Sequence, residues 1–203
     1  MKITNIGLFS TYFRPYYICN DEKVKTVDSA DESSEEFNYY PRLDKTDVKI
    51  ENQIDLSPFL RYSEDNEEAL ANFCKKAGVN EKMEPDKIVA KIATYYQKKY
   101  PYTLNPGITP MKKDFVNYFL EEHNKGYCVH FATAATLALR YLGIPAKYVQ
   151  GYAIQYDDIL RGTLLQDEKY EDYYEGYNEL GETGVVEVEV TDASAHAWVE
   201  IYD

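Results

Sequence analysis

Cysteine, histidine and tryptophan are scarce in this chain of 203 residues, which has three, three and one of them. A small, odd number of cysteines does not describe a scaffold held together by disulfides. We expect Cys19 and Cys74 to be buried free thiols, although the sequence leaves a disulfide between them open. No Cys-x-x-Cys pair, His-Glu-x-x-His sequence or glycine-rich phosphate loop is present, so we expect no metal and no other cofactor.

Basic residues are also few. The chain has 22 lysines and arginines but 35 aspartates and glutamates, which gives a net charge of −13. A negative field of this kind repels phosphate backbones, so we expect no nucleic-acid partner. No apolar run approaches the roughly 18 residues that a membrane-spanning helix needs. Residues 198–203 read as a strand that is cut short, and we therefore expect the chain to be a fragment of a larger protein.

Apolar residues make up 44% of the chain, which is enough for a hydrophobic core. We interpret residues 1–60 as an N-terminal extension of strands and loops, and residues 61–203 as the core domain, truncated at its C-terminus. Apolar spacing and helix-stop residues predict helices over about 63–78, 85–100 and 114–122.

The pattern changes at residue 126, where a glycine precedes a helix rich in small residues that ends at Gly143. Strands are predicted over 146–154, 185–191 and 197–202. The acidic, tyrosine-rich segment 155–184 is predicted to be a long loop, which either covers a site as a lid or only decorates the surface. Helices that precede a central helix and then strands indicate an α+β fold, with an antiparallel sheet behind the central helix.

Cys128 stands at the start of the central helix, where backbone N–H groups and the positive end of the helix dipole favour a thiolate. A nucleophilic thiol needs a base, which is usually histidine. His130 is two residues further along the helix and therefore points about 200° away. His123 could lie anywhere nearby, whereas His196 opens a strand that could pack beside the helix. By residue type alone, a cysteine on an apolar helix is more often a core residue than a nucleophile.

Two separated stretches narrow these alternatives. Residues 126–152, GYCVHFATAATLALRYLGIPAKYVQGY, and residues 196–202, HAWVEIY, resemble the transglutaminase-like superfamily. The usual pattern of that family is a Gly-x-Cys helix, then Leu-Arg-x-x-Gly-Ile-Pro-Ala-Arg, a strand ending in Gly-Tyr, and later a histidine strand. Lys147 stands where the family usually has arginine. The upstream Tyr102-Thr103-Leu104 is similar to the bacterial branch, whose members are often membrane-anchored.

The resemblance implies a papain-like core in which the Cys-bearing helix packs on an antiparallel sheet. It also implies that Cys128 is the nucleophile and that His196 is the base and general acid. Members of the family form a thioester with a glutamine side chain or a peptide carbonyl, which an amine or water then resolves. The implied partner is a protein or peptide substrate, and the sequence does not decide between transferase, deamidase and peptidase.

The third catalytic residue of the family is an aspartate that usually lies on the strand after the histidine strand. We expect it beyond Asp203, so that this fragment would be weakly active or inactive. An alternative function is a catalytically inactive module that binds peptides or cell wall. The bacterial relatives further imply an extracytoplasmic, soluble fragment of a cell-surface protein whose membrane anchor lies outside it. The sequence does not indicate an oligomeric state.

Overall fold

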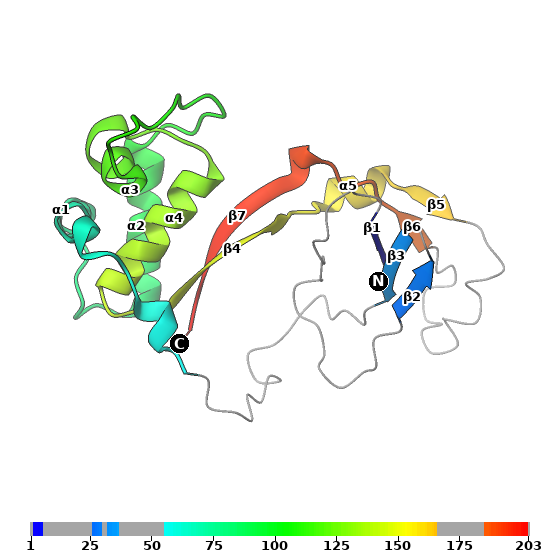
Figure 1. Cartoon of the computed structure of the whole chain (residues 1–203), viewed down its shortest axis with the longest axis horizontal. Coiled ribbons are helices and arrows are strands. Elements are labelled where there is room, and N and C mark those ends of the chain that lie inside the picture. Colours follow the sequence, from blue (N-terminus) through cyan, green and yellow to red (C-terminus); the bar gives the residue numbers. More distant parts are fainter. Residues whose placement is uncertain (1, 6–25, 30–31, 37–54, 166–184, 203) are drawn as a thin grey trace. The chain divides into compact units, whose positions relative to one another are not determined.

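The computed structural model describes residues 2–5, 26–29, 32–36, 55–165 and 185–202 (Figure 1). The chain divides into two compact units, residues 1–54 and 55–203. The first unit contains a small antiparallel sheet with the strand order β1-β3-β2, built from β1 (Lys2–Asn5), β2 (Thr26–Ser29) and β3 (Glu32–Glu36). Cys19 and most of the acidic segment, residues 166–184, lie outside the described residues.

The second unit begins with two helices that confirm the first two helix predictions. After the short turns η1 (Ser57–Leu60) and η2 (Glu64–Asn66), α1 runs over Glu67–Ala77 and α2 over Pro85–Lys99. Gly78 ends α1 with φ 70, a left-handed conformation that favours glycine. Pro85 occupies the first turn of α2, where backbone N–H groups have no partner within the helix, so the N–H that proline lacks is not needed there.

The third predicted helix exists, but it is less regular than expected. It begins as α3 (Phe115–Asn117) and continues as the wider π-helical turn η3 (Tyr118–His123). The Asp114 side chain caps its start by accepting hydrogen bonds from the backbone N–H groups of Val116 and Asn117, at 2.9 and 3.0 Å. The buried Asn66 amide donates to Asp114 over 2.7 Å, which ties this helix to the beginning of α1.

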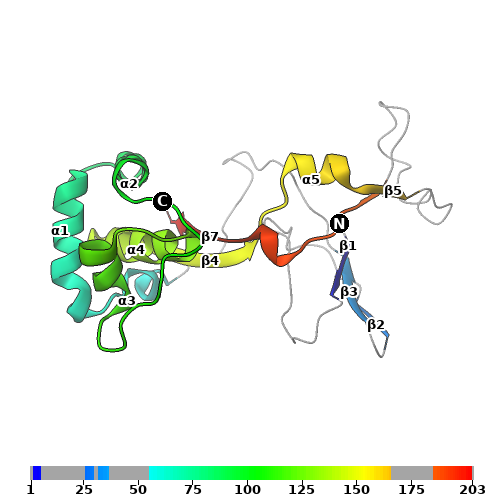
Figure 2. The ribbon, with the colours of Figure 1, turned by 90° about the horizontal axis from the view of Figure 1, so that it is seen from above.

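The central helix, α4 (Cys128–Tyr141), lies among the other helices and beside two strands (Figure 2). The strands are β4 (Ala146–Tyr152) and β7 (Ala195–Ile201), which pair antiparallel, and α4 packs against both. Ala134 and Ala138 of α4 are fully buried in the main core, which also contains Phe73 of α1 and Phe119 of η3. The predicted α+β fold, with a Cys-bearing helix on an antiparallel sheet, is therefore confirmed.

A short connection fixes the end of α4 to the sheet. The helix ends at Tyr141, and Gly143, two residues later, has a φ of 80 that favours glycine. The guanidinium of Arg140 then donates hydrogen bonds to the carbonyl oxygens of Ala146 and Arg61, at 2.9 and 2.8 Å. One side chain thus joins the last turn of α4, the first residue of β4 and the segment that precedes α1.

The region between β4 and β7 differs in part from the predicted loop and strand. Its beginning is not a plain loop, because α5 (Tyr156–Arg161) and β5 (Thr163–Leu165) form there. The predicted strand 185–191 is shorter, since only β6 (Val185–Glu187) pairs with β5, and the turn η5 (Asp192–Ser194) then leads into β7. In the part of the chain that the structure describes, no helix has the length and apolar character needed to cross a bilayer.

Candidate active site

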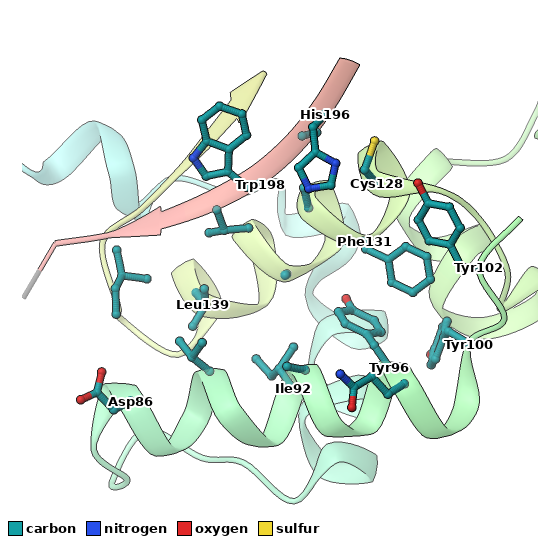
Figure 3. A pocket seen from close by; sticks show the side chains of 18 residues that line it. Asp86, Ile92, Tyr96, Tyr100, Tyr102, Cys128, Phe131, Leu139, His196 and Trp198 are labelled. Carbon is teal, nitrogen blue, oxygen red and sulfur yellow. The ribbon is translucent and has the colours of Figure 1, made fainter. Parts of the chain in front are cut away.

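A pocket of about 660 Å³ opens between α2, α4 and β7 (Figure 3). Cys128 and His196 line one end of it, and Asp86 lies at the opposite end. Successive residues of a strand point to opposite faces, and both His196 and its neighbour Ala197 line the pocket. The pocket therefore runs along the edge of β7 that does not pair with β4.

Cys128 is the first residue of α4, and its free thiol is partly exposed. The chain just before it is held by a short ladder with the segment that follows α2. The Gly126 N–H donates to the carbonyl of Pro101 over 3.2 Å, and the Thr103 N–H donates to the carbonyl of Gly126 over 2.7 Å. The helix start that carries the thiol is therefore tied to a second segment of the unit.

Gly126 is required by the side chain of His130. A β-carbon at Gly126 would lie 2.5 Å from Cγ and 2.7 Å from Cβ of His130, distances that no real contact shows. The His130 ring is buried, packs 4.8 Å from the ring of Phe115, and accepts a hydrogen bond at Nδ1 from the Tyr127 N–H over 3.4 Å. Burial lowers the pKa of His130, and nearby His123 lowers it further. The His130 ring therefore packs against the two residues, Gly126 and Tyr127, that precede the helix.

His196 is the second residue of β7 and lies opposite Gly151 of β4. Its exposed ring lies almost parallel to the indole of Trp198, with the ring centres 6.4 Å apart. The indole also covers Gly151, since a β-carbon there would lie 3.0 Å from Cη2 of Trp198. Because Gly151 has no side chain, the indole of Trp198 has room to lie over β4 beside His196.

The structure separates the three histidines. His196 lines the pocket with Cys128, whereas His123 and His130 do not. The His123 ring contacts the carbonyl of Pro106 and stacks on Tyr118 at 5.0 Å, while His130 lies among the core aromatics. The two residues that the sequence assigned to catalysis, Cys128 and His196, therefore come from distant parts of the chain to one end of one pocket. Their catalytic roles stay predictions.

The carboxylate of Glu200, on the same strand as His196, is engaged elsewhere. It accepts a hydrogen bond from Trp198 Nε1 over 3.2 Å and lies 3.8 Å from the ammonium of Lys147. Lys147 thus keeps a cation at the position where the family usually has arginine. Asp203 lies outside the described residues, and within them no cluster of three or more histidines, cysteines or acids could hold a metal ion.

The sequence did not identify the aromatic wall of the pocket. Four aromatic side chains line the cavity. They belong to Tyr96 of α2, Tyr100 at the end of that helix, Tyr102 just beyond it, and Phe131 of α4. The Tyr96 ring lies 5.1 Å from that of Phe131, at an interplanar angle of 88°. Helical spacing could mark Tyr96 as a core position, but only the packing of α2 on α4 places it in the pocket.

The contact between Gly126 and His130 predicts an unusually costly substitution. Gly126→Ala should lower the free energy of unfolding by about 1–3 kcal/mol, because the added methyl group overpacks a buried ring. His130→Ala removes two of the three close contacts, so Gly126→Ala should cost less in that background. Denaturant unfolding of both single variants and the double variant measures the coupling, and fully additive costs would contradict the contact.

The two described cysteines should differ in reactivity. Burial raises the pKa of Cys74 to about 11, so at pH 8 almost none of it is the reactive thiolate. In a Cys19→Ser background, iodoacetamide at pH 8 should alkylate Cys128 and leave Cys74 intact. Labelling of Cys74 should rise only as the pH approaches 11 or when the protein unfolds. Peptide mass spectrometry distinguishes the two sites, and equal labelling of both at pH 8 would refute the difference.

Comparisons with known proteins agree with the fold and with the motifs. YebA of Bacillus subtilis, described as uncharacterized, is 35% identical over 100 residues, which is 49% of this chain and 11% of YebA. A protein-glutamine gamma-glutamyltransferase of Pseudomonas aeruginosa is 37% identical over 65 residues, 32% of this chain and 9% of that protein. The chain therefore matches only about a tenth of the length of these curated relatives.

The fold also matches a solved structure. The crystal structure of the periplasmic domain of TgpA from Pseudomonas aeruginosa covers 85% of this chain, with a TM-score of 0.50 and 22% identity, and the match covers 49% of that domain's chain. At the level of families, the model of the transglutaminase-like superfamily matches residues 72–203. This match includes α2, α4, β7 and the pocket between them, and the chain belongs to the transglutaminase-like superfamily.

Proposed function

We propose that this chain carries the nucleophile and the base of an enzyme that transfers acyl groups from protein or peptide substrates through a thioester. One observation carries the proposal: Cys128 at the start of α4 and His196 on β7 line the same end of an open pocket. Membership in the transglutaminase-like superfamily supports it, because that family contains enzymes built on this pair of residues.

The first half of the proposed reaction forms the thioester. The His196 imidazole removes the thiol proton of Cys128, and the sulfur adds to the carbonyl carbon of a glutamine side chain or a peptide bond. When the tetrahedral intermediate collapses, the carbon–nitrogen bond breaks, and the imidazolium returns its proton to the departing ammonia or amine. The acyl group then remains on the sulfur.

The second half frees the enzyme. A primary amine or water attacks the thioester carbonyl, and His196 accepts the proton of the attacking group. The carbon–sulfur bond then breaks, the thiolate takes up that proton, and an amide or a carboxylic acid leaves. An amine as the attacking group makes the enzyme a transferase, and water makes it a deamidase or peptidase.

The start of α4 is suited to the negative charges in this reaction. The first N–H groups of an α-helix have no partner within the helix, and the helix dipole adds a positive potential there. The backbone N–H of Cys128 therefore serves as a donor to the oxyanion in our proposal. Beside the base, the indole of Trp198 lies almost parallel to the imidazole, with the ring centres 6.4 Å apart.

We further propose that the acid that orients His196 comes from a strand that follows Asp203. Within the described residues β7 pairs only with β4, and its other edge borders the pocket. A strand paired along that edge would bring a carboxylate beside the imidazole, where it would hold the ring and stabilise its charged form. In that arrangement the added strand lies along β7, and the substrate binds at the end of the pocket that contains Cys128.

The name of one relative supports glutamine as the acyl donor, since the Pseudomonas aeruginosa protein is called a protein-glutamine gamma-glutamyltransferase. The periplasmic origin of the TgpA domain supports an extracytoplasmic location. We propose accordingly that the substrate is a glutamine-bearing protein or peptide met outside the cytoplasm, by a protein whose membrane anchor lies outside residues 1–203.

The test uses the natural full-length protein, a glutamine-containing peptide and a fluorescent primary amine. Ammonia release reports thioester formation, amine incorporation reports transfer, and new peptide ends report cleavage. Cys128→Ala should abolish all three, and His196→Ala should lower the rate by about 10²–10⁴-fold, the usual contribution of a general base. Cys74→Ala, a change at a buried thiol outside the pocket, should retain the wild-type rate.

Two results would count against the proposal. Peptide binding without ammonia release or cleavage in the wild type, unchanged in Cys128→Ala, would instead support an inactive binding module. Activity that survives Cys128→Ala would assign the chemistry to another residue.

A further inference from the structure

A tyrosine that the proposed reaction has not used lies beside the thiol. Tyr102 sits in the segment that pairs with Gly126, and its backbone forms an isolated parallel bridge to that glycine. Two backbone hydrogen bonds fix the residues on either side of Tyr102. The Gly126 N–H donates to the carbonyl of Pro101, and the Thr103 N–H donates to the carbonyl of Gly126. The position of Tyr102 is therefore fixed relative to the residue that stands two places before Cys128.

The ring of Tyr102 is held on the same side of α4 as the thiol. It stacks on Phe131, with ring centres 6.0 Å apart and planes only 14° from parallel. Phe131 follows Cys128 by three residues, and side chains at this spacing share one face of a helix. Phe131 is itself held edge-on by Tyr96 at 5.1 Å and by Phe119 at 5.4 Å. The stack therefore positions Tyr102 from a well-packed part of the molecule.

The hydroxyl of Tyr102 points toward Cys128 across the end of the pocket (Figure 3). Tyr102 as a whole residue remains 61% exposed, so a substrate carbonyl can reach the space between the two residues. A phenol donates one hydrogen bond and lies among the side chains that form oxyanion holes in acyl-transfer enzymes. The backbone N–H of Cys128, the first residue of α4, is the donor proposed above, and the phenol belongs to the segment after α2.

We infer that the Tyr102 hydroxyl is a second donor to the oxyanion that forms when the Cys128 sulfur adds to the substrate carbonyl. The carbonyl oxygen gains negative charge as the carbon–sulfur bond forms, and the phenol O–H stabilises that charge without giving up its proton. The charge returns to the carbonyl when the carbon–nitrogen bond breaks. This inference rests on the proposed function, because it assumes a tetrahedral intermediate on Cys128.

The test compares two reactions of the same sulfur in wild type, Tyr102→Phe and Tyr118→Phe. Acylation by an activated ester, p-nitrophenyl acetate, passes through an oxyanion, whereas alkylation by iodoacetamide does not. Tyr102→Phe keeps the ring that stacks on Phe131 and removes only the hydroxyl. Tyr118 stacks on His123 outside the pocket, so its variant is the matched control for the loss of a phenol hydroxyl.

We expect Tyr102→Phe to lower the limiting acylation rate constant by about 10²-fold, as loss of one oxyanion donor does. The ester concentration at half-saturation and the alkylation rate should not change, and Tyr118→Phe should match the wild type in both reactions. Unchanged acylation in Tyr102→Phe would overturn the inference. An equal loss of acylation and alkylation would also overturn it, because the hydroxyl would then act on the thiol or on the fold.

Failure of the proposed function would look different. The wild type would then form no acyl-enzyme on Cys128, or Cys128→Ala would be acylated equally well. Either result would remove the tetrahedral intermediate, and the role of Tyr102 would fall with it.

Discussion

The packing of α4 between the helical core and the β4–β7 pair is the constraint on which the candidate site depends. Ala134 and Ala138 are completely buried on the core side of the helix, and Ala132 and Ala135 line the pocket on the side of the thiol. Such small side chains allow the helix to lie close to its neighbours on both sides. This packing places the first turn of α4 next to the beginning of β7. Cys128 and His196, which these elements carry, therefore line the same end of the pocket.

Two contacts between a glycine and an aromatic ring refine this arrangement, one beside each residue of the pair. At Gly126 the absent β-carbon makes room for the His130 ring, which accepts a hydrogen bond from the N–H of Tyr127, the residue just before the helix. At Gly151 it makes room for the indole of Trp198, which lies beside His196. The glycines of the sequence motifs therefore have a steric reason, since a larger residue at either position would push against a ring that positions the site. His130 is a structural residue despite being the histidine nearest to Cys128 in sequence.

Much of this could be read from the sequence, because local patterns decide it. Helix periodicity and stop residues predicted α1, α2 and α4, and the same periodicity indicated that His130 is a poor partner for Cys128. Contacts between distant segments were not accessible in this way. Only the structure excludes His123, whose ring is engaged by Pro106 and Tyr118, and only the bridge to Gly126 brings Tyr102 beside the thiol. The helix and strand at residues 156–165 were missed because they were grouped with the acidic, tyrosine-rich segment 155–184, although they contain only two acidic residues themselves.

The proposed chemistry requires the sulfur of Cys128 and the imidazole of His196 to face each other at contact range, and a short bifunctional reagent measures whether they do. The reagent 1,3-dibromoacetone alkylates a thiol with one end and can alkylate an imidazole with the other only if the ring lies a few ångströms away. We expect a single bridge between Cys128 and His196, with loss of both bromides, found by peptide mass spectrometry and absent from His196→Ala. A bridge from Cys128 to His123 or His130, or attachment at Cys128 without any bridge, would contradict it.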